Sequence, residues 1–182
     1  MNQKIGVIGL GIMGSAISAN LLRAGFTVTG YDIRPEPIQI LESQGGSGAT
    51  NVRELAGVSD VVITSLPSVA ALQEVVSGPD GLLTAAKPGL IVVEVSTFPI
   101  EAKQEAFTLL KEKGMVMLDC PLSGTGAQAV TKDLAVYASG DGQLCEKYRP
   151  VFDGFARVTY YIGAFGTGSK MKFIANLLVP NA

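Results

Sequence analysis

The sequence predicts an α/β fold with a doubly wound, mostly parallel sheet, and three observations support this prediction. Short apolar runs alternate with helix-like segments through most of the 182 residues, the pattern of a parallel sheet covered by helices on both faces. The first apolar run leads directly into a glycine-rich turn that opens a helix. The second apolar run ends in an acidic residue about 20 positions later, the spacing found in Rossmann-type folds.

The first two-thirds of the chain predicts regular βα alternation. Strands are expected at the apolar runs 4–8, 27–31, 61–65, 90–95 and 115–119, with a shorter one near Gly48. Helices are expected at residues 12–24, 37–43, 68–76 and 99–113. The last of these helices has matched start and stop signals, because Pro99 lies in its first turn, lysines lie in its last turn and Gly114 follows it.

After residue 119 the regular alternation of strands and helices ends. A loop is followed by a strand at 134–138, a polar helical stretch at 143–149 and a strand at 158–162. A second glycine cluster, Gly163, Gly166 and Gly168, then opens an apolar helix at 169–178. Because Pro180 disfavours continuation of this helix, the helix is expected to be cut short within a few turns.

The first glycine-rich turn has the spacing of a dinucleotide site. The first glycine allows a tight turn, the second lets the backbone approach a pyrophosphate, and the third lets helix and strand pack closely. The helix N-terminus then presents N–H groups and a positive dipole end to the phosphates. The alternative is a plain glycine-rich turn of another α/β domain. The expected cofactor-binding residues here are Gly9, Leu10, Gly11, Ile12, Met13 and Gly14.

Asp32 and Arg34 bear on the choice of cofactor. A carboxylate at the end of the second strand can accept hydrogen bonds from both adenosine ribose hydroxyls, and it repels a 2′-phosphate. Asp32 therefore favours NAD. Arg34, two residues later, could pair with a 2′-phosphate or stack on adenine, which keeps NADP as a second candidate. A solvated surface cation is the alternative interpretation of Arg34.

The composition excludes several classes of site and partner. The chain has no histidine, so proton transfer near neutral pH falls to Lys, Asp, Glu, Tyr or Cys. Its two cysteines, Cys120 and Cys145, lack the paired spacing of a metal or redox site and predict reduced thiols of a cytoplasmic protein. A net charge of −2 with interspersed signs predicts neither a nucleic-acid partner nor a membrane surface. No apolar run reaches the roughly 18 residues that a membrane span requires.

Five ordered segments of the chain resemble the β-hydroxyacid dehydrogenases, the group that contains 3-hydroxyisobutyrate dehydrogenase and tartronate semialdehyde reductase. They are the glycine turn with its helix, Leu66-Pro67, Ser96-Thr97, the run from Asp119 to Gly124, and the run from Gly166 to Asn176. The resemblance covers essentially the whole chain. It implies a dinucleotide-binding Rossmann domain over residues 1–165 and the start of an interdomain helix over residues 166–182.

The resemblance also implies residue roles. Leu66, Pro67 and Thr97 would line the cofactor, and Lys172 would be catalytic. Substrate binding would involve Ser123, Gly124, Thr125 and Asn176. Independently of the resemblance, the spacing of four places Lys172 and Asn176 on one helix face, with Lys170 on roughly the opposite side. A neutral amine could serve as the base once desolvation and a cationic nicotinamide lower its pKa from about 10.4.

The function expected from these residues is an NAD(P)-dependent oxidoreductase that interconverts a small β-hydroxy acid and its semialdehyde or keto acid. The alternative is a truncated dinucleotide-binding module with little or no turnover, because the all-helical C-terminal domain usual in this family is absent from the sequence. Thr125 replaces the family's second glycine, which leaves the preferred acid open. Imine reductases are a third option, against which Lys172 argues. Exposure of Phe173, Leu177 and Leu178 predicts a homo-oligomer.

Overall fold

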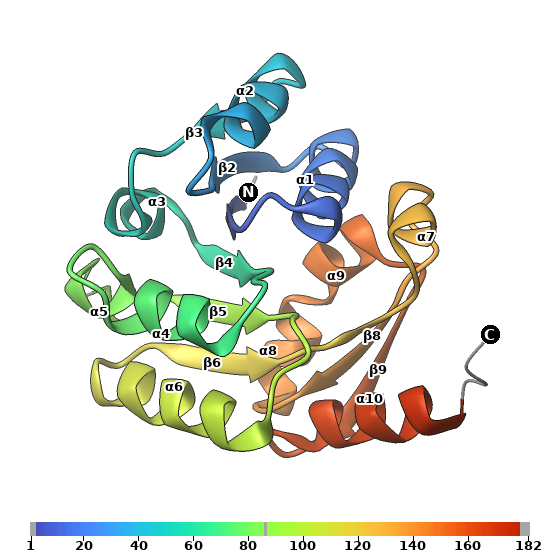
Figure 1. The fold of residues 1–182 in the computed structure, drawn as a ribbon. Coiled ribbons are helices and arrows are strands. Elements are labelled where there is room, and N and C mark those ends of the chain that lie inside the picture. Colours follow the sequence, from blue (N-terminus) through green and yellow to red (C-terminus); the bar gives the residue numbers. More distant parts are fainter. Residues whose placement is uncertain (1–2, 86, 179–182) are drawn as a thin grey trace.

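A computed structural model describes residues 3–85 and 87–178, and it confirms the α/β fold with a mostly parallel sheet (Figure 1). The strands are β1 (Lys4–Ile8), β2 (Thr27–Tyr31), β3 (Ser47–Gly48), β4 (Val61–Thr64), β5 (Ile91–Glu94), β6 (Val116–Asp119), β7 (Leu122–Ser123), β8 (Ala135–Ser139) and β9 (Val158–Gly163). The helices are α1 (Ile12–Arg23), α2 (Pro35–Ser43), α3 (Val52–Val58), α4 (Val69–Ser77), α5 (Leu82–Ala85), α6 (Ile100–Glu112), α7 (Gly126–Val130), α8 (Gly142–Lys147), α9 (Arg149–Phe155) and α10 (Thr167–Leu178).

The strand order creates a crevice at one edge of the sheet. The order is β3-β2-β1-β4-β5-β6-β8-β7, and β9 pairs with β8. From β3 to β6 every pairing is parallel, whereas β8 runs antiparallel to β6 and β7. The chain passes from β1 outward to β2 and β3 and then returns to place β4 on the other side of β1. This reversal is a topological switch point, and ligands of open α/β sheets bind outside the carboxyl ends of the strands there.

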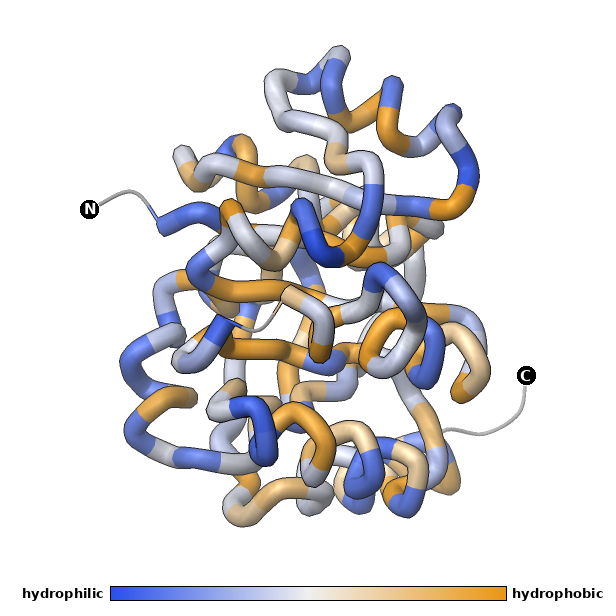
Figure 2. Tube along the Cα trace, turned by 90° about the vertical axis from the view of Figure 1, so that its left-hand side faces the viewer, coloured by the Kyte–Doolittle hydropathy of each residue, from blue (hydrophilic) through white to orange (hydrophobic). Residues whose placement is uncertain are grey.

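The central strands are buried on both faces, so their side chains fill two apolar cores. Helices α1, α8 and α9 cover one face, where Ile17, Leu21 and Phe152 pack against Val7 and Ile63. Helices α3, α4, α5 and α6 cover the other face. Figure 2 shows the result, with apolar strand segments through the middle of the molecule and hydrophilic segments on the outer sides of the helices.

Several short elements were not predicted. Helices α3, α5 and α7 and strand β7 occupy segments that the sequence analysis left as connections. The helical stretch expected at 143–149 ends earlier, and a second helix, α9, begins at Arg149. Pro150 explains the break, because it has no N–H to continue the ladder of α8 and is instead accommodated in the first turn of α9. Helix α2 begins at Pro35 for the same reason, two residues before the predicted start.

The C-terminal helix is partly packed and partly exposed. Its first turn contacts β6, β8 and β9, with Gly168 and Ser169 buried. Its last described residues project past the sheet, and Leu177 and Leu178 are 85% and 77% exposed (Figure 1). The boundary expected at residue 166 stays a prediction, and residues 179–182 lie outside the described part of the chain. Within the residues described, no helix has the length and apolarity needed to cross a bilayer.

Candidate functional site

The glycine turn between β1 and α1 is built by close backbone approaches. Gly9 has a φ of +86°, and a Cβ there would overlap the carbonyl oxygen of Ser65. A Cβ on Gly14 would overlap the carbonyl oxygen of Gly9, so helix and strand touch at this point. Gly11 is the N-cap residue of α1, and a Cβ there would meet nothing within 4 Å. The turn is therefore tight on its inner side and open on its outer side, in front of the helix N-terminus.

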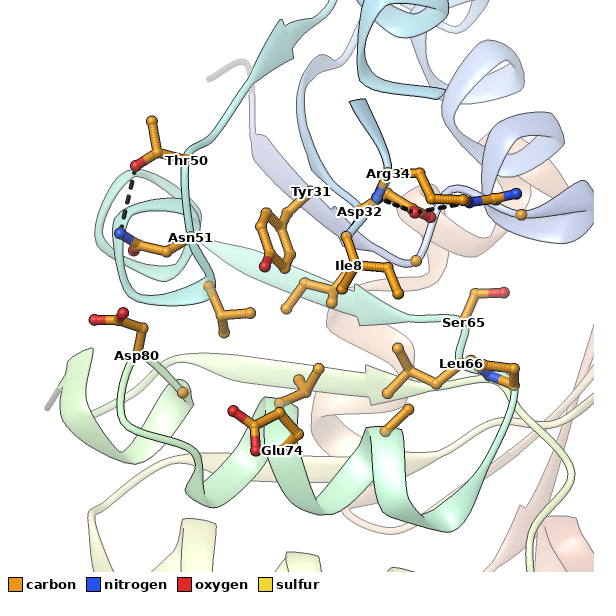
Figure 3. A pocket seen from close by; sticks show the side chains of 18 of the residues that line it. Ile8, Tyr31, Asp32, Arg34, Thr50, Asn51, Ser65, Leu66, Glu74 and Asp80 are labelled. Atoms are coloured by element: carbon orange, nitrogen blue, oxygen red, sulfur yellow. Dashed lines mark hydrogen bonds and ion pairs between the residues drawn. The ribbon is translucent and has the colours of Figure 1, made fainter. Parts of the chain in front are cut away.

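A cavity of about 690 Å³ lies in front of this turn at the switch point (Figure 3). Figure 3 shows Asp32 and Arg34 on one wall, Leu66 facing them, and Asn51 and Asp80 at the far end. Eight of the predicted cofactor residues line the cavity: Gly9, Gly11, Ile12, Met13, Asp32, Arg34, Leu66 and Pro67. Leu10 and Gly14 do not line it, because the Leu10 side chain is buried in the core and Gly14 packs under the turn.

The Asp32 carboxylate is hydrogen-bonded to the glycine turn that it faces. Its Oδ2 accepts a hydrogen bond from the backbone N–H of Leu10 at 2.8 Å, and its Oδ1 accepts one from the N–H of Arg34 at 2.9 Å. The Nε of Arg34 adds a longer contact of 3.3 Å to Oδ1. An ionised carboxylate has about four lone-pair directions. A ligand hydroxyl can therefore be accepted once the Arg34 side chain, which is 61% exposed, moves aside.

A second cavity, of about 310 Å³, adjoins the first and contains the predicted catalytic amine. Met13, Ser65, Leu66 and Pro67 line both cavities, so the two are contiguous. The remaining wall of the second cavity consists of Val95, Ser96, Thr97, Phe98, Leu122, Gly124 and Lys172. The structure thus brings Lys172, which follows the glycine turn by more than 150 positions, to the same cleft as Thr97 and Gly124.

The half-buried position of Lys172 changes its acid–base behaviour. Burial lowers the pKa of the Lys172 amine, because the apolar walls disfavour the ammonium form. The direction is the one that a general base requires. Lys170 is exposed, as its position on the other side of the helix predicts.

Three of the predicted substrate-binding residues do not line this cavity. Thr125 is the N-cap residue of α7 and forms a capping box there, since its Oγ1 accepts the Gln128 N–H and its own N–H donates to Gln128 Oε1. Its hydroxyl is thereby engaged with the helix end. Asn176 is exposed, one turn beyond Lys172, and Ser123 is half-buried in β7. The described residues therefore bring Gly124 and Lys172 together without these three side chains.

The sequence analysis missed a buried charge cluster beneath the second cavity. Lys103, Glu94 and Asp119 are all fully buried, and the Lys103 Nζ lies 2.7 Å from Glu94 Oε2 and 2.7 Å from Asp119 Oδ1. Burial raises the pKa of Glu94, against the nearby Lys103 charge. For Lys103 burial opposes the charged form, but Glu94 and Asp119 outweigh it and raise its pKa. A signal existed, because Lys103 shares a helix face with Ala106 and Leu110, where an apolar residue is expected.

The two cysteines are reduced and inaccessible. Cys120 and Cys145 are both free and buried. Burial raises the pKa of the Cys120 thiol well above its usual value and that of Cys145 to about 11. Among the described residues, no cluster of His, Cys, Asp and Glu could hold a metal ion.

Comparisons with known proteins agree with this geometry. The family described as the NAD binding domain of 6-phosphogluconate dehydrogenase matches residues 4–163. The chain is 35% identical over 178 residues to 2-(hydroxymethyl)glutarate dehydrogenase of Eubacterium barkeri, covering 97% of this chain and 58% of that protein. It is 36% identical over 179 residues to L-threonate dehydrogenase of Cupriavidus necator, covering 98% of this chain and 60% of that protein.

The fold comparison identifies the same kind of protein. The structure of Mycobacterium tuberculosis 3-hydroxyisobutyrate dehydrogenase with L-serine has a TM-score of 0.92 at 31% identity, covering 98% of this chain and 60% of that one. The chain therefore spans about 60% of the length of the proteins that it matches.

The free space in front of the Gly11 Cα predicts the effect of a substitution at this position. Gly11→Ala adds a methyl group where a phosphate would approach, so NADH should bind about tenfold more weakly while the urea unfolding midpoint stays unchanged. Gly57→Ala is the matched control, because a Cβ there also meets nothing within 4 Å and Gly57 lies in α3, away from the turn. Fluorescence titration with NADH checks both variants. Equal affinities for Gly11→Ala and Gly57→Ala would contradict a phosphate site at this turn.

Proposed function

Because the chain belongs to the family of the NAD binding domain of 6-phosphogluconate dehydrogenase, we propose that it is an NAD(P)-dependent oxidoreductase of small β-hydroxy acids. The reaction would interconvert the hydroxy acid and its semialdehyde or keto acid by hydride transfer. The observation that carries the proposal is the position of Lys172, whose half-buried amine lines a cavity contiguous with the one at the glycine turn. The dehydrogenases to which the chain is similar support the same reaction class.

The residues of the first cavity fit a dinucleotide. The open face of Gly11 and the N-terminus of α1 suit the diphosphate. Asp32, at the end of β2, suits the ribose hydroxyls and favours NAD, with NADP as the second candidate through Arg34. Leu66, Pro67 and Thr97 continue the wall toward Lys172. When bound, the nicotinamide supplies the hydride acceptor in oxidation and the hydride donor in reduction.

The chain's own residues supply the proton transfer and the orientation. In oxidation the neutral amine of Lys172 takes the proton of the substrate hydroxyl, while the hydrogen on the carbinol carbon leaves as hydride with both electrons of the C–H bond. In reduction the ammonium of Lys172 returns the proton to the new alkoxide oxygen. Backbone at Gly124 lies in the same cavity and can hold the substrate carboxylate. Ser123, Thr125 and Asn176, which do not line the cavity, are proposed to complete substrate binding next to Gly124 and Lys172.

A second candidate function is a dinucleotide-binding module with little or no turnover. One observation favours it: the side chains of Ser123, Thr125 and Asn176 do not line the cavity that contains Lys172. NADH binding without oxidation of any small hydroxy acid would support this alternative. Binding together with turnover would support the oxidoreductase.

The cofactor preference is testable at Asp32. We expect the protein to bind NADH about tenfold more tightly than NADPH, because the Asp32 carboxylate repels a 2′-phosphate. Asp32→Asn keeps an oxygen for the Leu10 N–H but removes the charge, so the ratio of the NADH affinity to the NADPH affinity should fall. Asp60→Asn is the control, because Asp60 is an exposed carboxylate that accepts a hydrogen bond from the N–H of Lys4, away from the glycine turn. Tighter binding of NADPH by the unaltered chain would defeat the interpretation of Asp32.

The role of Lys172 is testable by pH dependence. Since burial lowers its pKa, oxidation of a small β-hydroxy acid should speed up as pH rises through that lowered pKa and then level off, and reduction should show the opposite trend. Lys172→Ala should lower the rate about 10²- to 10⁴-fold. Lys170→Ala, which removes an exposed lysine of the same helix, should leave it unchanged. Equal rates for Lys172→Ala and Lys170→Ala would remove Lys172 from the mechanism.

We also propose that the chain forms a homo-oligomer and is cytoplasmic, the latter supported by its two free cysteines. The exposed apolar face of α10 supports association, because Leu177 and Leu178 are among the most exposed apolar residues while Phe173 is half-buried. Leu177→Glu should shift sedimentation toward the monomer. Val58→Glu, at an exposed apolar position of α3, should not. A monomeric unaltered chain would contradict this proposal.

A further inference from the structure

Three acceptors converge on one buried ammonium below the second cavity. The Nζ of Lys103 donates to the backbone oxygen of Ser96 at 2.6 Å and to Asp119 Oδ1 at 2.7 Å, and it forms an ion pair with Glu94 Oε2 at 2.7 Å. Two of the three contacts are hydrogen bonds, and the contact with Glu94 Oε2 is an ion pair without hydrogen-bond geometry. Lys103 comes from α6, Glu94 and Ser96 from the end of β5, and Asp119 from the end of β6. We refer to these four residues as the Lys103 cluster.

The cluster is connected to one wall of the cleft through Ser96. The Ser96 N–H donates to Glu94 Oε1 at 2.8 Å, and its Oγ accepts the backbone N–H of Leu66 at 2.9 Å. The turn after β4 and the turn after β5 are therefore fastened to each other and to the ammonium. Both turns line the second cavity, through Leu66, Pro67, Ser96 and Thr97.

The cluster is connected to the other wall through Asp119. Asp119 Oδ2 accepts the N–H of Ser169, and Oδ1 accepts its Oγ, each at 2.8 Å. Ser169 is buried in the first turn of α10, three residues before Lys172. A Cβ on Gly168 would overlap the backbone oxygen of Tyr137 and lie 2.8 Å from that of Asp119, so this turn rests directly on the middle of β8 and the end of β6. The position of α10 is thus set by Asp119.

We propose that Lys103 is a positioning residue whose ammonium sets the distance between the Ser96–Thr97 turn and the first turn of α10. The proposal rests on the proposed function of Lys172 as the amine of the cleft. It differs from a role in stability alone, because each acceptor of Lys103 belongs to, or holds, a segment that lines the cavity. Removing one partner of a buried ion cluster lowers stability in any case. The readouts that separate positioning from stability are therefore local ones, at the two cavity walls and at Lys172.

Ser169→Ala tests the α10 side of this arrangement without removing any charge. The variant loses the Oγ bond to Asp119 while the Lys103 cluster stays intact. We expect about fivefold faster amide hydrogen exchange at residues 169–172 and a Lys172 pKa that rises toward the ordinary value of about 10.4, measured by NMR of protein labelled at the lysine carbon next to Nζ. Ser59→Ala is the matched control, since Ser59 is equally buried at 1% exposure and its Oγ donates only within its own segment, to Leu55.

Lys103 itself is tested by two variants. Lys103→Met should raise exchange both at residues 96–98 and at residues 169–172 and raise the Lys172 pKa, whereas Lys103→Arg, which keeps a buried cation, should restore part of each change. If Lys103→Met does not fold, Lys103→Arg decides the role of Lys103, because the larger cation must change the distances among the same acceptors: exchange at residues 96–98 and 169–172 should rise together, and unchanged exchange at both would overturn the proposal. A Lys172 pKa and α10 exchange that match those of Ser59→Ala would overturn the proposal.

These readouts separate the inference from the proposed function, because none of them requires turnover. A Lys172 pKa that responds to Ser169→Ala in a chain without dehydrogenase activity would support the positioning role and contradict the oxidoreductase. An active chain in which Ser169→Ala changes neither readout would support the oxidoreductase and contradict the positioning role.

Discussion

The ion cluster formed by Lys103, Glu94 and Asp119 is the constraint on which the geometry of the cleft depends. Two adjacent strands, β5 and β6, each place a carboxylate at their carboxyl ends, and α6 supplies the single cation between them. Desolvating three charges is costly, and the cost is offset only when each charge is paired and hydrogen-bonded. Asp119 meets this condition with the two Ser169 groups and Lys103.

The two ends of the cleft are organised by different physical means. At the glycine turn the absence of side chains lets backbone meet backbone, with Gly14 against Gly9 and Gly9 against Ser65. At α10 one close glycine approach, at Gly168, is combined with the hydrogen bonds of Asp119. The first arrangement leaves N–H groups open toward a ligand, whereas the second directs a lysine into a partly apolar cavity. A charged ligand and the Lys172 amine can therefore occupy neighbouring parts of one crevice.

The main elements of the fold and both halves of the cleft could be predicted from the sequence. Apolar runs such as 61–65 predict buried parallel strands because both faces of such strands are covered, and the glycine spacing predicts the first turn. The missed elements are short. Helices α3, α5 and α7 have few turns, so they depend on tertiary packing and carry little periodic signal. The split between α8 and α9 could have been predicted from Pro150.

The sequence analysis missed a residue whose role depends on distant partners. Lys103 was included in the helix 99–113 without a role, because its acceptors, Glu94 and Asp119, become neighbours only when β5 and β6 pair. The hydroxyl of Thr125 is engaged in the capping box of α7, a local contact that the sequence analysis did not predict, and the role of Thr125 in substrate binding stays a prediction. By contrast, Lys172 and Gly124 were predicted through resemblance to a family, and they do line one cavity.

The burial of Cys120 has a consequence for chemical durability. Cys120 follows Asp119 directly in the chain, and burial raises the pKa of its thiol well above the usual value. Oxidants and electrophiles attack the thiolate form. A strand end next to the cleft therefore contains sulfur without being vulnerable to peroxide or to reactive aldehydes, the class of compound that the proposed reaction would itself produce.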